Sequence, residues 1–195
     1  MYDSVKAFRR LAGAVIAAAG LALAASAYPV AAVEIPKASP PVLVTSLGQS
    51  LDAFQVQIVT RRTGVPFEYE PRAEVDTLAK AKTLFLTVGA SLKGFGDAGI
   101  SIQDEIARSG RLLDEAKKLG ILVVVLHPGG EDRRDALTNQ LIALAAPRAQ
   151  LLIIRNDSDA DGTFARIAKA GNIPLVTFAS LPELLASMKA MFPGS

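Results

Sequence analysis

The sequence predicts an α/β protein: a three-layer α/β/α sandwich around a doubly wound parallel sheet of five or six strands. Short apolar runs alternate with helix-length amphipathic stretches from residue 41 onward. The most apolar run, residues 121–126 (ILVVVL), contains no polar position, which is typical of a strand buried on both faces. Strands joined by helix-length segments run parallel. We expect the flavodoxin-like strand order 2-1-3-4-5, with the Rossmann-like order 3-2-1-4-5-6 as the alternative.

The first half of this pattern predicts three strands, over residues 41–45, 65–69 and 83–88. A helix over residues 50–63 ends before Gly64. Its large apolar side chains share one face; they are Leu51, Phe54, Ile58 and Val59. A short helix is expected over residues 74–82, and the glycine-rich stretch 89–99 is expected to be a loop.

The second half predicts three more strands, over residues 121–126, 151–154 and 175–178. Ser101 opens a long helix, and Asp104 completes a capping box with it. The helix ends at Gly120, after the basic pair Lys117-Lys118, as helix carboxyl ends do. Further helices are expected over residues 132–146, 163–170 and 181–192.

Composition excludes several classes of site. With 195 residues, half of them hydrophobic, the chain can bury the core of one domain. It contains no cysteine, which excludes disulfides, thiolate metal sites and cysteine nucleophiles. Its single histidine excludes a site that needs two imidazoles, such as an ordinary catalytic zinc site.

The amino terminus has the pattern of a signal peptide over residues 1–27. Lys6, Arg9 and Arg10 precede an apolar run, and Ala25-Ser26-Ala27 fits a cleavage site. The run is short for a spanning helix, so cleavage is favoured over a retained anchor, which would be the only contact with the membrane. We therefore expect a periplasmic or otherwise extracytoplasmic protein.

The rest of the chain is divided into a Pro- and Ala-rich linker, residues 28–40, and a single Rossmann-like domain, residues 41–195. Loss of the leader removes three basic residues and one acid from a total of 21 basic and 19 acidic residues, which leaves the two signs equal. The sequence therefore gives no basic field for nucleic acid.

In an open parallel sheet, ligands bind at the carboxyl ends of the strands. The glycines and hydroxyls expected there would let backbone N–H groups approach a small anionic metabolite, with Lys93, His127, Arg133 and Arg134 supplying positive charge. The other expected ligand-binding residues are Ser46, Gly48, Gln49, Ser50, Gly89, Ser91 and Gly129. The alternative for His127 is a packed residue at a strand end, and for the two arginines a solvated helix end.

The sequence also raises three other possible functions: FMN binding, hydrolysis and protein interaction. Thr45, Gly48 and Ser50 partly match a flavodoxin phosphate loop, but no aromatic residue is placed to stack on a flavin, which argues against FMN. His127 could act as a base for Ser46 or Ser91 in an envelope hydrolase, although no G-x-S-x-G elbow is present. The sequence therefore favours a binding protein over an enzyme.

The segment 157–162 matches the first half of a calcium loop, with Asp157, Asp159 and Asp161 alternating before Gly162. The twelfth position is Ala168 rather than glutamate, so an EF-hand is excluded. The alternative is a run of acids that favours a helix amino terminus without a metal. With calcium or without it, a third function is a non-catalytic interaction module, whose partner would be an envelope or transporter protein.

Several stretches together resemble domain of unknown function 6305, a bacterial family. They are residues 41–50 (PVLVTSLGQS), 88–94 (VGASLKG), 127–134 (HPGGEDRR), 159–162 (DADG) and 172–175 (NIPL). The resemblance covers residues 40–192. It implies an exported, single Rossmann-like domain and no particular activity. Our first hypothesis, an exported small-molecule-binding domain, rests on the leader and on the polar residues expected at the strand ends.

Overall fold

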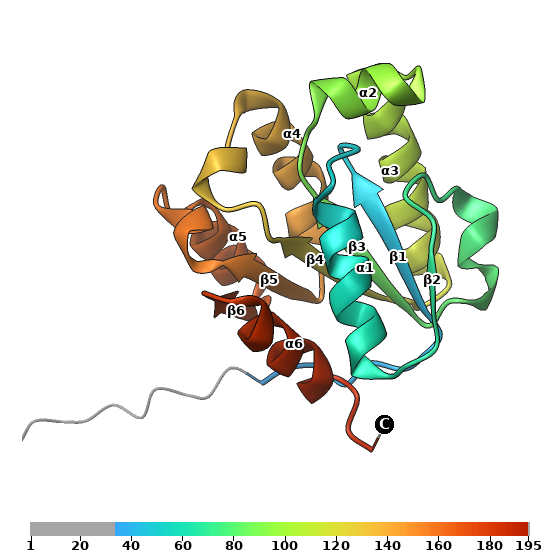
Figure 1. Cartoon of the computed structure of the whole chain (residues 1–195), viewed down its shortest axis with the longest axis vertical. Helices are drawn as coiled ribbons and strands as arrows, with labels where there is room; N and C mark the ends of the chain where they lie inside the picture. Colours follow the sequence, from blue (N-terminus) through green and yellow to red (C-terminus); the bar gives the residue numbers. More distant parts are fainter. Residues whose placement is uncertain (1–33, 195) are drawn as a thin grey trace, which may run out of the picture. The chain divides into compact units, whose positions relative to one another are not determined.

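The computed structural model describes residues 34–194, and its sheet has six parallel strands (Figure 1). Their order is β2-β1-β3-β4-β5-β6, which confirms the doubly wound prediction: the flavodoxin-like order, extended by a sixth strand. The strands are β1 (Val42–Leu47), β2 (Phe67–Tyr69), β3 (Thr83–Val88), β4 (Leu122–His127), β5 (Leu151–Arg155) and β6 (Leu175–Phe178). The predicted signal peptide and residues 28–33 lie outside the described residues.

The helices form the outer layers of the sandwich and one short cap. They are α1 (Asp52–Thr63), α2 (Leu92–Ala98), α3 (Ile102–Lys118), α4 (Ala136–Ala145), α5 (Thr163–Gly171) and α6 (Leu181–Ala190). Short 3-10 turns join them: η1 (Val75–Lys80), η2 (Glu131–Arg133), η3 (Ala146–Arg148) and η4 (Asn156–Asp159). None of the helices in the described part of the chain has the length and apolar character needed to cross a bilayer.

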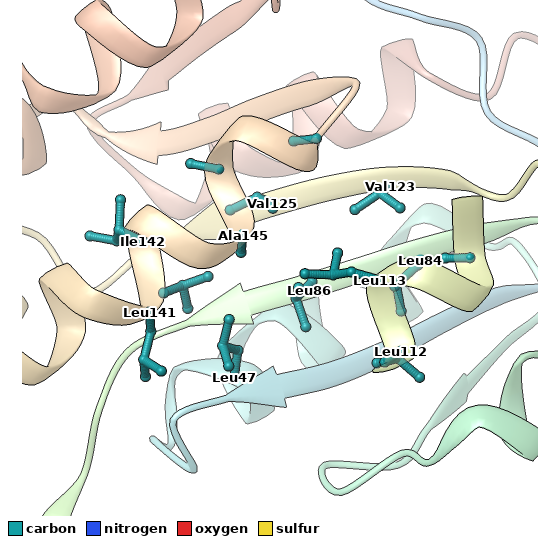
Figure 2. Packing of buried hydrophobic residues seen from close by; sticks show 14 of the residues in the cluster. Leu47, Leu84, Leu86, Leu112, Leu113, Val123, Val125, Leu141, Ile142 and Ala145 are labelled. Carbon is teal, nitrogen blue, oxygen red and sulfur yellow. The ribbon is translucent and has the colours of Figure 1, made fainter. Parts of the chain in front are cut away.

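Two hydrophobic clusters fill the space on either side of the sheet. One face packs against α3, α4 and α5, where Leu112, Leu141 and Phe164 meet the strands; Figure 2 shows the part of this cluster around α3 and α4. The other face packs against α1 and α6 through Val56 and Leu184. Burial on both faces is why the strand sequences are almost continuously apolar.

Side-chain alternation assigns each strand residue to one of the two faces. In β1, Leu43 and Leu47 belong to the cluster under α3–α5, whereas Val42 and Val44 belong to the one under α1 and α6. Ser46 therefore faces α1 and α6. The same rule in β4 places His127 on the opposite face, where its ring lies 5.6 Å from that of Phe164.

The predicted capping box of α3 is present. The Ser101 hydroxyl accepts a hydrogen bond from the Asp104 backbone N–H at 3.1 Å, and the Asp104 carboxylate accepts one from the Ser101 N–H at 3.0 Å. These bonds satisfy two N–H groups that have no partner inside the helix, which fixes where α3 begins.

The large apolar residues that predicted α1 do not form its buried face. Leu51, Phe54 and Ile58 are 81%, 51% and 39% exposed, and only Val59 of the four is buried. The buried face instead carries small and polar residues, including Ala53 and Thr60. Helix α1 packs directly on the sheet, beside α6 (Figure 1), and these smaller side chains form its contact with the strands.

Helix α2 was expected to be a loop, because Gly94, Gly96 and Gly99 lower helix propensity. It forms because the Ser91 hydroxyl accepts a hydrogen bond from the Gly94 N–H, which caps its first turn. Gly99, in the left-handed conformation, ends it. Gly94 also lies so close to the Gln49 carbonyl that a Cβ would not fit.

The end of the predicted linker, residues 34–40, lies against the domain. Ile35 and Ala38 pack on the cluster beneath α1 and α6, and the Ala38 N–H donates to the Met191 carbonyl at 2.7 Å. Ser39 and Thr83 exchange two hydrogen bonds at the start of β3. The chain therefore enters the domain at the amino edge of the sheet, opposite the predicted site.

Candidate functional site

The loops after β1 and β3 are joined directly to each other at the carboxyl edge of the sheet. The Gly48 carbonyl accepts the Ser91 N–H at 2.8 Å, and the Leu47 carbonyl accepts the Gly89 N–H at 2.9 Å. Gln49, with a positive φ of 58°, bridges to Ala90. Gly48 has no room for a Cβ, because the Gly89 carbonyl already lies against it. These contacts hold the switch point of the sheet in one conformation.

A buried ion pair supports the β1–α1 loop from below. Glu105 and Arg108, both on α3, are 2.9 Å apart and almost fully buried. The Glu105 carboxylate accepts hydrogen bonds from the Gly48 N–H at 2.8 Å and from the Gln49 side chain at 3.0 Å. Arg108 donates to the carbonyls of Ser46 and Ala73 at 2.6 Å each. The pair thus fixes the backbone on both sides of Leu47.

The carboxylate of this pair stays ionised although it is buried. Burial by itself would raise the pKa of Glu105, but the hydrogen bonds and charge of Arg108, with the bonds from Gly48 and Gln49, lower it below its ordinary value. Stability from the ionised pair is therefore present above the ordinary glutamate pKa and is lost as the pH falls below it.

Above these loops lies a set of polar side chains that we call the carboxyl-edge cluster: Ser50, Asp52, Arg133, Arg155 and Asp157. The Ser50 hydroxyl donates to the Asp52 carboxylate at 3.0 Å. Arg155 makes a two-bond ion pair with Asp157 through Nε, at 2.7 Å, and Nη2. The bond to Asp157 raises the pKa of Arg155, and the charges of Asp132 and Asp52 act in the same direction.

Three glycines provide the room for this cluster. A Cβ on Gly89 would lie 2.7 Å from the Asp52 carboxylate and 2.8 Å from the Ser50 hydroxyl. A Cβ on Gly129 would clash with Arg133, and one on Gly130 with the Arg155 guanidinium. Gly130 also has a φ of +71°, which L side chains rarely adopt. The glycines at the strand ends are therefore needed for close approach by polar side chains.

The predicted cationic side chains differ in how many hydrogen bonds and ion pairs they make with other groups of the protein. Lys93 is exposed and paired with Asp97 on its own helix at 2.8 Å. Arg134 donates hydrogen bonds to Asn139, to the Ser158 carbonyl and to Asp161. Its guanidinium carbon also lies 5.3 Å from the centroid of the Phe164 ring. Arg133 differs from both. Its guanidinium is 4.0 Å from Asp52, and its side chain is 41% exposed.

His127 is a packed histidine in this structure. It is fully buried, and its Nδ1 lies 2.8 Å from the Val88 carbonyl, so the neutral ring donates there. Burial lowers its pKa below the ordinary value, and the charge of Arg134 acts in the same direction. His127 is therefore neutral near pH 7 and cannot supply the positive charge that we predicted for it.

The serines of the alternative hydrolase are not brought to His127. Ser46 faces α1 and α6, on the opposite side of the sheet from the imidazole, and the Ser91 hydroxyl caps α2. The hydroxyls of Ser46 and Thr87, residues paired across β1 and β3, are buried without a hydrogen-bond partner among the described residues. The geometry therefore provides no serine–histidine pair.

Two groups of the flavodoxin-like phosphate loop are already engaged within the protein. The Thr45 hydroxyl is buried and accepts the Ala73 N–H, and the Gly48 N–H donates to Glu105. Tyr69 packs edge-on against Phe54 with 6.4 Å between ring centroids.

The acidic loop directs its carboxylates to different partners. Asp157 pairs with Arg155, and Asp159 accepts the backbone N–H groups of Phe164 and Ala165. Hydrogen bonds from Thr163 and Arg134 outweigh the effect of burial and lower the pKa of Asp161 to about 2. Within residues 34–194, no three His, Cys, Asp or Glu side chains are grouped so that they could hold a metal ion.

Sequence reasoning missed four residues that build this edge: Asp52, Glu105, Arg108 and Arg155. A signal for two of them was present. Glu105 and Arg108 share a helix face with Leu112, and a charge on an apolar face predicts a buried partner. Asp52 and Arg155 carried no comparable signal, because each follows a strand or loop in which polar residues are expected.

Comparison with known proteins gives one match. The sequence profile of a family described as domain of unknown function (DUF6305) matches residues 39–192. The chain belongs to DUF6305. The match spans the domain from the arm at Ser39 to Phe192, so it includes every residue of the carboxyl-edge cluster. No curated protein and no solved structure matches the chain significantly.

Proposed function

We propose that this DUF6305 protein is an exported small-molecule-binding domain that holds a small organic anion at the carboxyl edge of its sheet. The observation that carries the proposal is the state of Arg133. Of the arginines at this edge, Arg134 and Arg155 are held by short hydrogen bonds, whereas Arg133 makes a single 4.0 Å ion pair within residues 34–194 and remains partly open to solvent. A ligand carboxylate could form the two-bond contact that Asp52 leaves unmade.

The neighbouring acids restrict the charge of the ligand. Asp52 lies beside Arg133, and Asp157 neutralises Arg155, so the formal charges of the cluster sum to zero. A ligand with a single negative charge and further hydroxyl or amino groups fits this balance better than a phosphate dianion. Ser50 and Asp52 would bind those polar groups, and Gly89 lets both side chains approach the backbone closely.

Export is part of the proposal because residues 1–27 have the pattern of a cleaved leader. A periplasmic or other extracytoplasmic location would expose the site to small metabolites outside the cytoplasm. Fractionation of cells that produce the full chain, followed by mass determination of the mature protein, tests this part. Cleavage after Ala27 supports it, and a cytoplasmic protein with Met1 retained contradicts it.

A ligand panel tests binding itself. We would follow the thermal unfolding of the purified protein by circular dichroism, since the chain has no tryptophan for intrinsic fluorescence. The panel contains hydroxy acids, amino acids, dicarboxylates, phosphate, FMN and calcium. A ligand at a hundred times its dissociation constant adds ~2.7 kcal/mol to the free energy of unfolding, a shift of several degrees. No shift with any organic anion contradicts the proposal.

The exposed stripe on α1 supports a second candidate, an interaction module for an envelope or transporter protein. Leu51, Phe54 and Ile58 recur at helical spacing on the outer side of α1, and Tyr69 packs against Phe54. Crosslinking in cells that carry Leu51→Ser/Phe54→Ser tests it, with Gln55→Ala as the control. Crosslinks that are lost only in the double variant support the module, and identical crosslinks in all three proteins contradict it.

A further inference from the structure

A cavity of about 400 Å³ lies at the amino edge of the sheet, on the opposite side of the molecule from the carboxyl-edge cluster. It opens between the end of α3, the starts of β4 and β5, and the segment between α5 and β6. Its lining includes Leu113, Lys117, Val123, Arg148, Ala149 and Ile173. The volume falls in the range of small-molecule sites.

The residues at the floor of this cavity are apolar and almost fully buried, whereas most of the surface that the cavity exposes is polar. Leu113, Val123 and Ala149 are buried members of the cluster under α3–α5, and Ile173 packs against them. Gly171 has no side chain to close the opening, and a Cβ there would press on Ile173. The floor is therefore suited to the hydrocarbon part of a ligand.

The rim carries a small excess of positive charge. Lys117 is exposed and has no ion pair or side-chain hydrogen bond among the described residues. Arg148 pairs with Asp114 at 3.2 Å, with both side chains largely in solvent. Exposed pairs of this kind contribute little free energy, so the Arg148 guanidinium can turn toward a ligand.

The floor and rim together point to one class of ligand. We propose that this cavity binds a small monocarboxylate with an apolar body, such as a medium-chain fatty acid or an arylalkanoate. The hydrocarbon covers Val123, Ala149 and Ile173, and the carboxylate lies between Lys117 and Arg148. Lys117 and Arg148 must offset the negative carboxyl ends of α3 and α5 for the one carboxylate, and Asp114 disfavours a second negative charge. The inference is independent of the site at Arg133.

We would measure octanoate binding by isothermal titration calorimetry. The protein is produced from the full chain and purified with or without its leader, as the cell has processed it. We expect a dissociation constant on the order of 1 mM or tighter, with a negative heat-capacity change from apolar burial. Acetate lacks the body, 1-octanol lacks the charge, and suberate adds a second carboxylate. Each of these three is expected to bind at least about tenfold more weakly.

Two neighbouring lysines give a matched pair of variants. Lys117→Met keeps the apolar stem and removes the charge in the cavity, and we expect it to weaken octanoate about tenfold. Lys118→Met removes a charge one residue away that is already paired with Glu115 at 2.9 Å, and it should leave binding unchanged. Equal binding by both variants and the wild type would overturn the proposal, as would the absence of octanoate binding.

Two further measurements separate this site from the one at Arg133. Arg133→Gln should leave octanoate binding unchanged, and Lys117→Met should leave the anion of the carboxyl-edge site unaffected. Amide shifts in an NMR titration should be largest at Ala149, Gln150 and Gly171. Shifts centred on Gly89 and Gly129 instead would show that octanoate occupies the other edge and would contradict the assignment.

Discussion

At the scale of single residues, Gly130 and Gly110 differ in the space that is available for a Cβ atom. Gly130 combines a φ of +71° with a guanidinium where its Cβ would be. Gly110, inside α3, has neither constraint, because nothing lies within 4 Å of the position of its Cβ. The two glycines thus serve different ends, and alanine substitution distinguishes them.

We expect Gly130→Ala to lower the free energy of unfolding by roughly 1–3 kcal/mol, because it strains the backbone and displaces Arg155. Gly110→Ala should raise it by about 0.5–1 kcal/mol, since alanine is the better helix former and meets nothing. Urea denaturation measures both. Equal effects of the two substitutions would refute the role assigned to Gly130.

Titration of His127 should make the free energy of unfolding depend on pH. Burial lowers its pKa in the folded protein, so the unfolded chain takes up the proton first as the pH falls. The contribution to stability is complete above the ordinary histidine pKa of 6.5 and decreases as the pH falls toward the lowered folded value. His127→Gln lowers stability at all pH values but should remove this slope below pH 6.5. A slope that persists in the variant assigns the effect to another group.

At the scale of elements, α3 connects the core to the site. Its Glu105–Arg108 pair fixes the β1–α1 loop, and its apolar residues fill the cluster beneath. Removing one member of a buried pair leaves the other charge without its partner, which is far more costly than losing an exposed pair. The same helix carries such an exposed pair, Glu115–Lys118.

Glu105→Gln should lower the free energy of unfolding by about 3 kcal/mol, whereas Glu115→Gln should change it by less than about 1 kcal/mol. Thermal unfolding at neutral pH measures the difference. The wild type should also lose stability below pH 4.5, as the lowered pKa of Glu105 requires, and the Glu105→Gln variant should lose less. A small effect of Glu105→Gln would mean that the pair does not support the loop.

Element periodicity predicted the fold well, because each buried strand is a continuous apolar run. The strands over residues 83–88 and 175–178 have the predicted bounds, and the capping box places the start of α3. Periodicity failed for the stripe of α1, since apolar spacing does not show which side faces the core. The sequence predicted a loop in place of α2 because glycines lower helix propensity, although the Ser91 side chain caps this helix.

The site was predicted less completely than the fold. Topology alone places the loops after β1, β3 and β4 at one edge, and the predicted residues Ser50, Gly89, Gly129 and Arg133 lie close together there. Their binding of a ligand stays a prediction. The pairing of side chains could not be predicted, because it depends on long-range contacts such as that between Gly48 and Glu105. Those contacts remove Gln49, Arg134 and His127 from the set available to a ligand.

At the scale of the whole molecule, the two edges of the sheet differ in character. The carboxyl edge is rigid, glycine-lined and polar, whereas the amino edge holds a cavity with an apolar floor and receives the chain from its amino-terminal arm. Sites on opposite edges share no residue. Ligands bound at both edges should therefore raise thermal stability additively, and a shift from the pair that differs from the sum would indicate coupling.

The most direct test of the account is the affinity of the best anion from the panel for three proteins: wild type, Arg133→Gln and Lys93→Gln. We predict that Arg133→Gln weakens binding by about tenfold or more, because a charge-assisted contact is lost. Lys93→Gln should bind as the wild type does, since Lys93 already pairs with Asp97. Undiminished binding by Arg133→Gln would contradict the proposed site at the carboxyl edge.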